Sequence, residues 1–232
     1  MRILLLLCLA LAAPGAGAAP EWVVRSNAYA APILEDTGRF NPEFASRTGN
    51  DKFDTDIVDL GPRIQERVVA RIEERLAQAR GERDREGDPR VREDLDITIA
   101  MLERQLESER VRHELLFTYY DAAAIVNSGL MPLLDARNKP QRQARALVRI
   151  RRYAGLEPGY TPVAALARDR TEEEIARPGT IGPYADEVRQ SLDNTDFFIK
   201  GIAERLRQDG LTGWERDFDV LAGQLREYRE WA

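Results

Sequence analysis

Apolar residues recur at every third or fourth position in two long segments of the chain. In the first segment they are Ile57, Leu60, Ile64, Val68, Ile72 and Leu76, and in the second Leu95, Ile99, Leu102 and Leu106. Such spacing gathers the apolar side chains on one face of an α-helix. Residues 80–88, between the two segments, contain no apolar residue. The pattern predicts an antiparallel helical hairpin with residues 80–88 as its solvated turn.

Helix boundary signals are frequent in the rest of the chain. Asn41 and Asp88 are each followed by a proline, a combination typical of a cap and a first helical residue, and Thr212 stands three residues before Glu215, as in a capping box. Further helices are expected near residues 120–135, 140–154, 162–176, 183–193, 196–209 and 213–231.

Signals for β-strands are scarce, since no alternating β-branched run and no Asn-Gly or Asp-Gly hairpin occurs. Gly155 and Gly210 stand where glycines end helices. The sequence therefore predicts an all-α fold, a multi-helix array that includes the long antiparallel hairpin.

The first eighteen residues have the composition of a secretory signal peptide. Arg2 precedes an unbroken apolar run over residues 3–13, and small residues follow up to Ala18. The run is shorter than the about 20 apolar residues that span a bilayer. We therefore expect a signal peptide over residues 1–18 and one helical domain over residues 19–232, exported to the periplasm or secreted. Cys8, the only cysteine, lies in the signal, so we expect no disulfide.

The composition narrows the possible functions. The chain has 34 Lys and Arg against 40 Asp and Glu, a formal charge of −6, and a single histidine. An acidic balance makes nucleic acid a poor default partner. One histidine excludes, within this chain, any metal site that needs two.

That histidine begins a sequence that is similar to the zinc-peptidase motif HExxH. The motif works because two histidines one helical turn apart bind zinc while the glutamate acts as general base. Here His113 and Glu114 are followed by Phe117 at the fifth position. We therefore interpret His113 as a polar residue on a helix face and assign no metal ligand.

Two acidic clusters are interpreted as surface features. Asp51, Asp54, Asp56 and Asp59 lack the glycine and terminal glutamate of an EF-hand loop, and are expected in a solvated loop. Residues 172–174 are three consecutive glutamates, expected on a helix surface. No nucleophile elbow, Ser-x-x-Lys, P-loop or dinucleotide-binding motif occurs, so no catalytic or cofactor-binding residue is assigned.

The strongest charge feature is a basic helix face formed by Arg142, Arg145, Arg149 and Arg152. Arginines prefer bidentate carboxylate partners, and the chain is rich in Asp and Glu, so pairing within the chain is the favoured interpretation. The alternative is that the face contacts an anionic ligand or a partner protein.

Five short blocks resemble the N-terminal half of a bacterial family known as domain of unknown function 885. They are residues 26–34 (SNAYAAPIL), 88–95 (DPRVREDL), 147–156 (LVRIRRYAGL), 159–162 (GYTP) and 210–214 (GLTGW). Members of that family are exported, largely helical and similar to zinc metallopeptidases, with HExxH in their C-terminal half. The resemblance implies a helical lobe that packs against a catalytic lobe, with zinc only in that other half.

The end of the sequence bears on this interpretation. The last predicted helix runs to Trp231 without a C-terminal glycine or a polar tail, which indicates an incomplete lobe or a docked terminal helix. The leading hypothesis is a scaffold lobe of a metallopeptidase-like protein of unknown substrate, inactive by itself, whose partner is a missing catalytic lobe or a second copy. The alternative is a standalone extracytoplasmic binding module that uses the basic face. A hydrolase that uses acidic residues alone is the third hypothesis.

Overall fold

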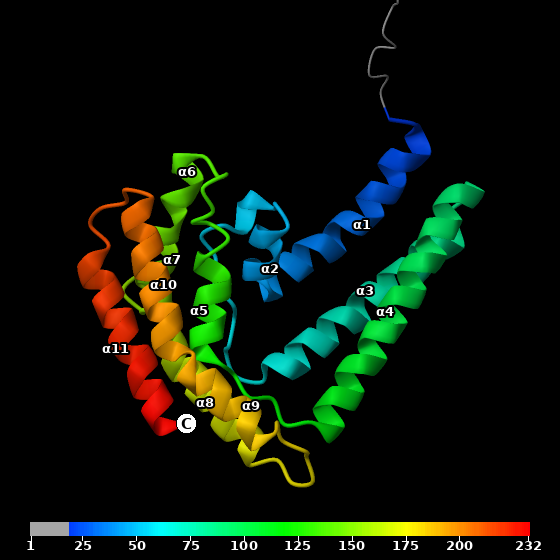
Figure 1. Cartoon of the computed structure of the whole chain (residues 1–232). Helices are drawn as coiled ribbons and strands as arrows, with labels where there is room; N and C mark the ends of the chain where they lie inside the picture. The colour runs from blue at the N-terminus through cyan, green and yellow to red at the C-terminus, as the bar shows by residue number, and fades with distance from the viewer. Residues whose placement is uncertain (1–18) are drawn as a thin grey trace, which may run out of the picture.

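A computed structural model describes residues 19–232, and within that range the chain is all-α (Figure 1). The predicted fold class is therefore confirmed. The predicted signal peptide, residues 1–18, lies outside the described residues. None of the described helices combines the length and apolar composition that crossing a membrane requires.

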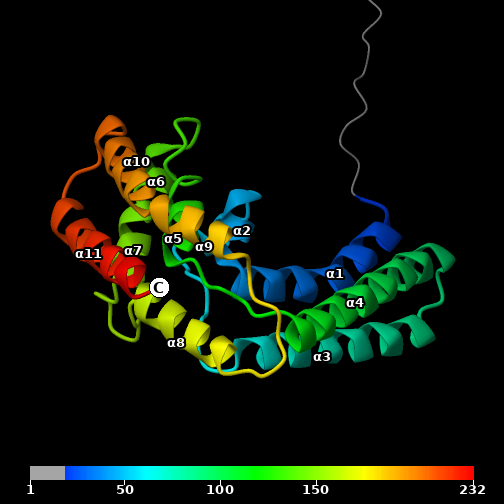
Figure 2. The ribbon, with the colours of Figure 1, turned by 60° about the horizontal axis from the view of Figure 1, so that its bottom comes forward.

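The predicted helical hairpin is present and projects from the rest of the molecule (Figures 1 and 2). Its arms are α3 (Ile64–Arg85) and α4 (Pro89–Leu115). The apolar positions of the two arms face one another, which explains why both helices have a 3.6-residue period. The buried residues between them are Ile72, Leu76, Ala79, Leu102 and Leu106.

The turn of the hairpin is shorter than predicted. Helix α3 continues to Arg85, so residues 80–85 are helical and only residues 86–88 connect the arms. Ion pairs between the arms hold this charged stretch in the helix: Arg80 lies 2.6 Å from Glu103, and Arg83 lies 2.9 Å from Asp96. The prediction of a solvated turn over residues 80–88 was wrong because these pairings depend on the second helix.

The start of α3 also differs from the periodic pattern. Ile57 and Leu60 precede the helix, which begins at Ile64. Leu60 is 3% exposed and belongs to the core of the other part of the molecule. Arg63, just before α3, has φ of 54° and is the only non-glycine residue with positive φ in residues 19–232.

Two N-terminal helices join the hairpin to the body. Helix α1 (Glu21–Phe40), which was not predicted, lies along both hairpin arms (Figure 2). Asp36 of α1 accepts a 2.5 Å hydrogen bond from Arg75 of α3. Helix α2 (Pro42–Arg47) follows, and the Asn41 side chain accepts a hydrogen bond from the N–H of Phe44, so the predicted cap is confirmed.

The remaining helices form the body around one apolar core that includes Val126, Leu133, Ile150, Ile202 and Leu221. Helix α11 closes the body and is docked along its length, since Leu225 and Tyr228 are buried. The helices are α5 (Ala122–Leu130), α6 (Pro140–Gln143), α7 (Arg145–Tyr153), α8 (Val163–Ile175), α9 (Ala185–Asp193), α10 (Thr195–Gln208) and α11 (Glu215–Trp231).

Some predicted boundaries in the body are corrected. The helix expected over residues 120–135 ends at Leu130, and the helix expected over residues 140–154 is interrupted at Ala144. Trp214, rather than Thr212, directly precedes α11 and makes no side-chain capping hydrogen bond. Gly155 and Gly210 have φ of 69° and 68° directly after helices, as predicted.

Candidate functional site

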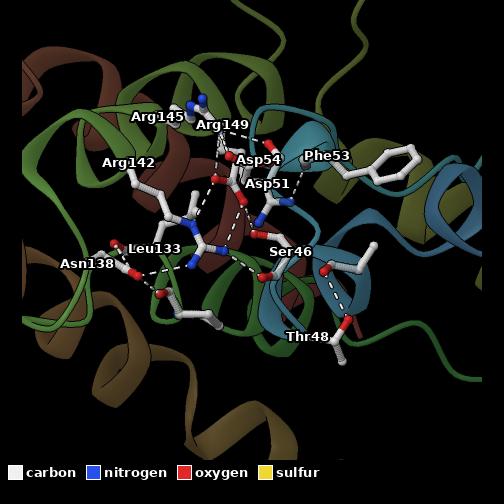
Figure 3. A network of polar contacts seen from close by, with 12 residues as sticks. Ser46, Thr48, Asp51, Phe53, Asp54, Leu133, Asn138, Arg142, Arg145 and Arg149 are labelled. Atoms are coloured by element: carbon white, nitrogen blue, oxygen red, sulfur yellow. Dashed lines mark hydrogen bonds and ion pairs between the residues drawn. The ribbon is translucent and has the colours of Figure 1, made fainter. Parts of the chain in front are cut away.

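Two of the four predicted arginines bind one buried carboxylate (Figure 3). The Nε of Arg142 donates to Asp54 at 2.9 Å, and Arg145 donates to the same carboxylate at 3.0 Å. The hydroxyl of Ser46 donates a third hydrogen bond, at 2.6 Å. Burial alone would raise the pKa of Asp54, but the hydrogen bonds from Arg142, Ser46 and Arg145 outweigh burial and lower it.

The third arginine, Arg149, is completely buried and binds backbone carbonyl oxygens. Its nitrogens donate to the carbonyls of Phe53 at 2.8 Å, Asp56 at 2.9 Å, Gly129 at 2.6 Å and Pro42 at 3.2 Å. These oxygens belong to three separate segments of the chain. Arg149 therefore fixes α2, the segment that follows it and the end of α5 to α7.

The fourth arginine, Arg152, binds the segment around Thr55 and Asp56. Arg152 donates to the carbonyl of Thr55 at 2.8 Å and to the Asp56 carboxylate at 2.9 Å, and its Nε donates to Glu157 at 3.0 Å. Its guanidinium also lies over the ring of Tyr160, 4.9 Å from the centroid. All four arginines are thus engaged within the chain, but only Arg142, Arg145 and Arg152 pair with carboxylates as predicted, whereas Arg149 binds backbone carbonyls.

The predicted solvated loop of aspartates is corrected by these contacts. Asp54 is 0% exposed, and Asp51 begins a short 3-10 helix, η1 (Asp51–Phe53). Asp59 pairs with Arg67 at 2.5 Å. The prediction was wrong for Asp54, because its basic partner Arg142 lies 88 residues further along the chain, whereas Asp51 is exposed and Asp56 and Asp59 lie in a loop as predicted.

We call the four arginines Arg142, Arg145, Arg149 and Arg152 the arginine clamp. A buried polar contact joins the helix that carries this clamp to the segment around Val58. The hydroxyl of Tyr153 donates to Glu43 at 2.7 Å, and the N–H of Val58 donates to the same oxygen at 2.9 Å. Burial and the charge of Glu43 raise the pKa of Tyr153 well above its ordinary value, against the opposing effect of Arg149. A Cβ at Gly129 would lie 2.0 Å from the Tyr153 hydroxyl oxygen, so the contact needs glycine there.

Val58 forms part of a groove of about 300 Å³ between α1, α3, α4 and residues 58–60. The floor of the groove is apolar and is formed by Ile33, Leu60, Ile64, Val68, Ile72 and Leu102. Polar groups stand around this floor, among them the Asp36–Arg75 pair. Gln65 donates to the hydroxyl of Tyr120 at 3.1 Å at one end. The sequence did not predict this groove, because one of its walls is the unpredicted helix α1.

The HExxH-like sequence is not part of this groove. His113 lies in the last turn of α4 and is partly buried, whereas Phe117 lies beyond the end of the helix. Over residues 19–232, no group of three or more His, Cys, Asp or Glu side chains is arranged to hold a metal ion.

The predicted acidic surface at residues 172–174 is corrected in part. Glu174 is 6% exposed. Its carboxylate accepts from the N–H of Thr118 at 3.1 Å and from Arg177 at 2.6 Å. Glu174 therefore joins α8 to the segment that follows α4.

Comparisons with protein-family models, with curated proteins and with solved structures found no match to this chain. The resemblance to domain of unknown function 885 therefore stays a prediction.

Proposed function

We propose that this exported chain is a non-catalytic helical lobe of a metallopeptidase-like protein and that it binds part of a substrate in the groove between α1 and the hairpin. The groove is the observation that carries the proposal. Its volume of about 300 Å³ lies at the lower end of the range of ligand sites, and it combines an apolar floor with a few polar groups. Such a surface suits a ligand with an apolar body and a polar end.

The blocks that resemble the family support a scaffold role for the lobe. Arg149, Arg152 and Tyr153 belong to the block over residues 147–156, and their side chains hold the segment that ends in the groove wall. The Tyr153 hydroxyl and the Val58 N–H donate to the same carboxylate oxygen of Glu43. These residues therefore position the groove and perform no chemistry in our proposal.

The alternative, a standalone module that binds through the basic helix face, has less support. The guanidinium groups of Arg142, Arg149 and Arg152 donate to oxygens of the chain itself, and their side chains are between 0% and 25% exposed. A ligand at this face would have to displace those contacts. The geometry favours the groove.

An exposed apolar surface supports the packing of this lobe against a partner. Leu115, Leu116 and Ile181 are 48%, 45% and 69% exposed. They lie together, because the N–H of Ile181 donates to the carbonyl of Leu115 at 2.8 Å. We propose this surface as the contact with a catalytic lobe or with a second copy of the chain.

The test of groove binding uses Val68, a partly buried residue of the groove floor. Residues 19–232 are immobilised and exposed to a tryptic digest of casein, and the retained peptides are identified by mass spectrometry. We expect Val68→Trp to fill the groove and abolish retention. Val220→Trp, at an exposed site on α11, is the matched control and should retain the same peptides. Equal retention by wild type and Val68→Trp would overturn groove binding.

The non-catalytic assignment has a separate test. Purified residues 19–232, supplied with zinc, should show no peptidase turnover on casein. The gene sequence beyond the codon for Ala232 should encode a segment with HExxH. Tightly held stoichiometric zinc with turnover by residues 19–232, or unrelated sequence downstream, would contradict the assignment.

A further inference from the structure

The C-terminal end of α8 lies near the start of α3 and the end of α4 (Figure 2). Residues in and next to these three helices line a second cavity, of about 190 Å³. The Gln65–Tyr120 hydrogen bond borders both this cavity and the groove. The charged and imidazole side chains around the cavity are those of Arg63, Glu66, His113, Arg170, Glu173, Glu174 and Arg177.

Arg170 is the central feature of this cavity. Its side chain is only 7% exposed, and one terminal nitrogen forms an ion pair with Glu173, one turn along α8. Its Nε is buried and has no hydrogen-bond acceptor in residues 19–232. A buried N–H without an acceptor is unfavourable, and such groups are rare in folded proteins.

Two further polar groups lie at the same cavity. The Nδ1 of His113 is buried and has no partner among the described residues. The start of α3 has no side-chain cap, because Arg63 adopts a left-handed conformation and makes no capping hydrogen bond. The first N–H groups of a helix need acceptors and carry a partial positive charge.

The glutamates around the cavity leave the Nε of Arg170 and the Nδ1 of His113 without a hydrogen-bond partner. Glu174 is engaged by the N–H of Thr118 and by Arg177. Glu66 is 59% exposed and lies 3.8 Å from Arg63, and Glu173 is 51% exposed. The Nε of arginine is always a donor, so a ligand that contacts it must supply an acceptor oxygen.

We propose that this cavity binds an oxyanion, a carboxylate or a phosphate group, through Arg170, His113 and the N-terminus of α3. The Arg170 Nε donates to an oxygen of such a group while Glu173 contacts the terminal nitrogen, and a hydrogen bond from a charged donor to an oxyanion is stronger than a neutral one. This site goes beyond the proposed function and does not rest on it, since it involves neither a catalytic lobe nor the floor of the groove.

His113, the only histidine of the chain, provides the readout. In residues 19–232 prepared without a histidine tag, one imidazole Hε1 resonance reports on the cavity. Sodium acetate and sodium phosphate are titrated separately at fixed pH and fixed ionic strength, with sodium chloride as the reference. We expect a saturable shift of the resonance with acetate, with phosphate or with both, and the responding anion identifies the chemistry of the ligand. The absence of a saturable shift with either anion would overturn the proposal.

Substitutions on α8 test whether Arg170 holds the anion. Arg170→Gln should weaken binding by about tenfold or more, the loss expected for a hydrogen bond to a charged group. Arg168→Gln, an exposed site on the same helix, is the matched control and should bind as wild type does. Unchanged binding by Arg170→Gln would contradict the site.

Arg170→Lys keeps the charge but removes the Nε donor, and circular dichroism checks the fold of each variant. If Arg170→Gln does not fold, the Lys variant decides: weaker binding supports the site, and unchanged binding overturns it. In wild type, the binding anion should also raise the melting temperature relative to chloride.

Discussion

Tyr153 of α7 and Glu43 of α2 form a buried hydrogen bond of 2.7 Å although 110 residues separate them in the chain. The same carboxylate oxygen accepts from Val58 in the groove wall. The position of the groove therefore depends on a contact from the block over residues 147–156.

Tyr153→Phe should destabilise the protein by about 1–3 kcal/mol, because it leaves a buried carboxylate without one of its donors. Urea unfolding followed by circular dichroism measures the change. Tyr184→Phe is the control, since Tyr184 is 80% exposed, and it should have little effect. Equal stability of the Tyr153→Phe variant and wild type would show that the contact contributes nothing.

Arg149→Met should destabilise the protein by about 3 kcal/mol or more, because each buried oxygen that loses its donor costs roughly 1–3 kcal/mol. Arg151→Met on the same helix removes a partly exposed ion pair with Asp217, 2.8 Å long, and should change the free energy of unfolding by less than about 1 kcal/mol. The comparison separates the effect of losing the buried hydrogen bonds of Arg149 from the effect of losing a positive charge on the same helix. A similar loss in both variants would contradict the clamp.

The stability of the protein should fall in acid through Asp54. Its folded-state pKa lies below the ordinary value of 3.8, so the ionised carboxylate stabilises the fold above that pH, and this stabilisation is lost as the pH falls through the folded-state pKa. Asp54→Asn should flatten the dependence of the unfolding free energy on pH below about 4. The exposed Asp219→Asn should leave the slope unchanged. An identical slope in wild type and Asp54→Asn would refute this role.

The local features of the fold could be predicted from the sequence. The hairpin follows from the helical period of its apolar residues, and Asn41 and Asp88 cap the helices that follow them. Helical periodicity and capping each depend on residues only a few positions apart, so the sequence shows them directly.

The long-range features could not be predicted in the same way. Helix α1 contains Pro32 and buries few of its residues, so its pattern is weak until it packs on the hairpin. The sequence predicted that the basic face pairs with carboxylates of the chain, but it did not predict that the buried carboxylate would be that of Asp54. The groove and the Arg170 cavity each combine segments more than fifty residues apart, which no local pattern reports.

The exposed apolar surface at Leu115, Leu116 and Ile181 leads to a prediction about association. These side chains are between 45% and 69% exposed, and contiguous apolar surface of this kind marks contact sites. Residues 19–232 should therefore bind a hydrophobic dye and self-associate as concentration rises. Ile181→Glu should reduce both effects, because a charge in a buried contact is costly. Phe197→Glu, at a 72% exposed site on α10, is the control and should retain both. Sedimentation velocity and dye fluorescence measure the outcome. A strictly monomeric wild type that binds no dye would show that this surface packs against nothing, and the lobe proposal would then lose its contact face while the groove proposal stood.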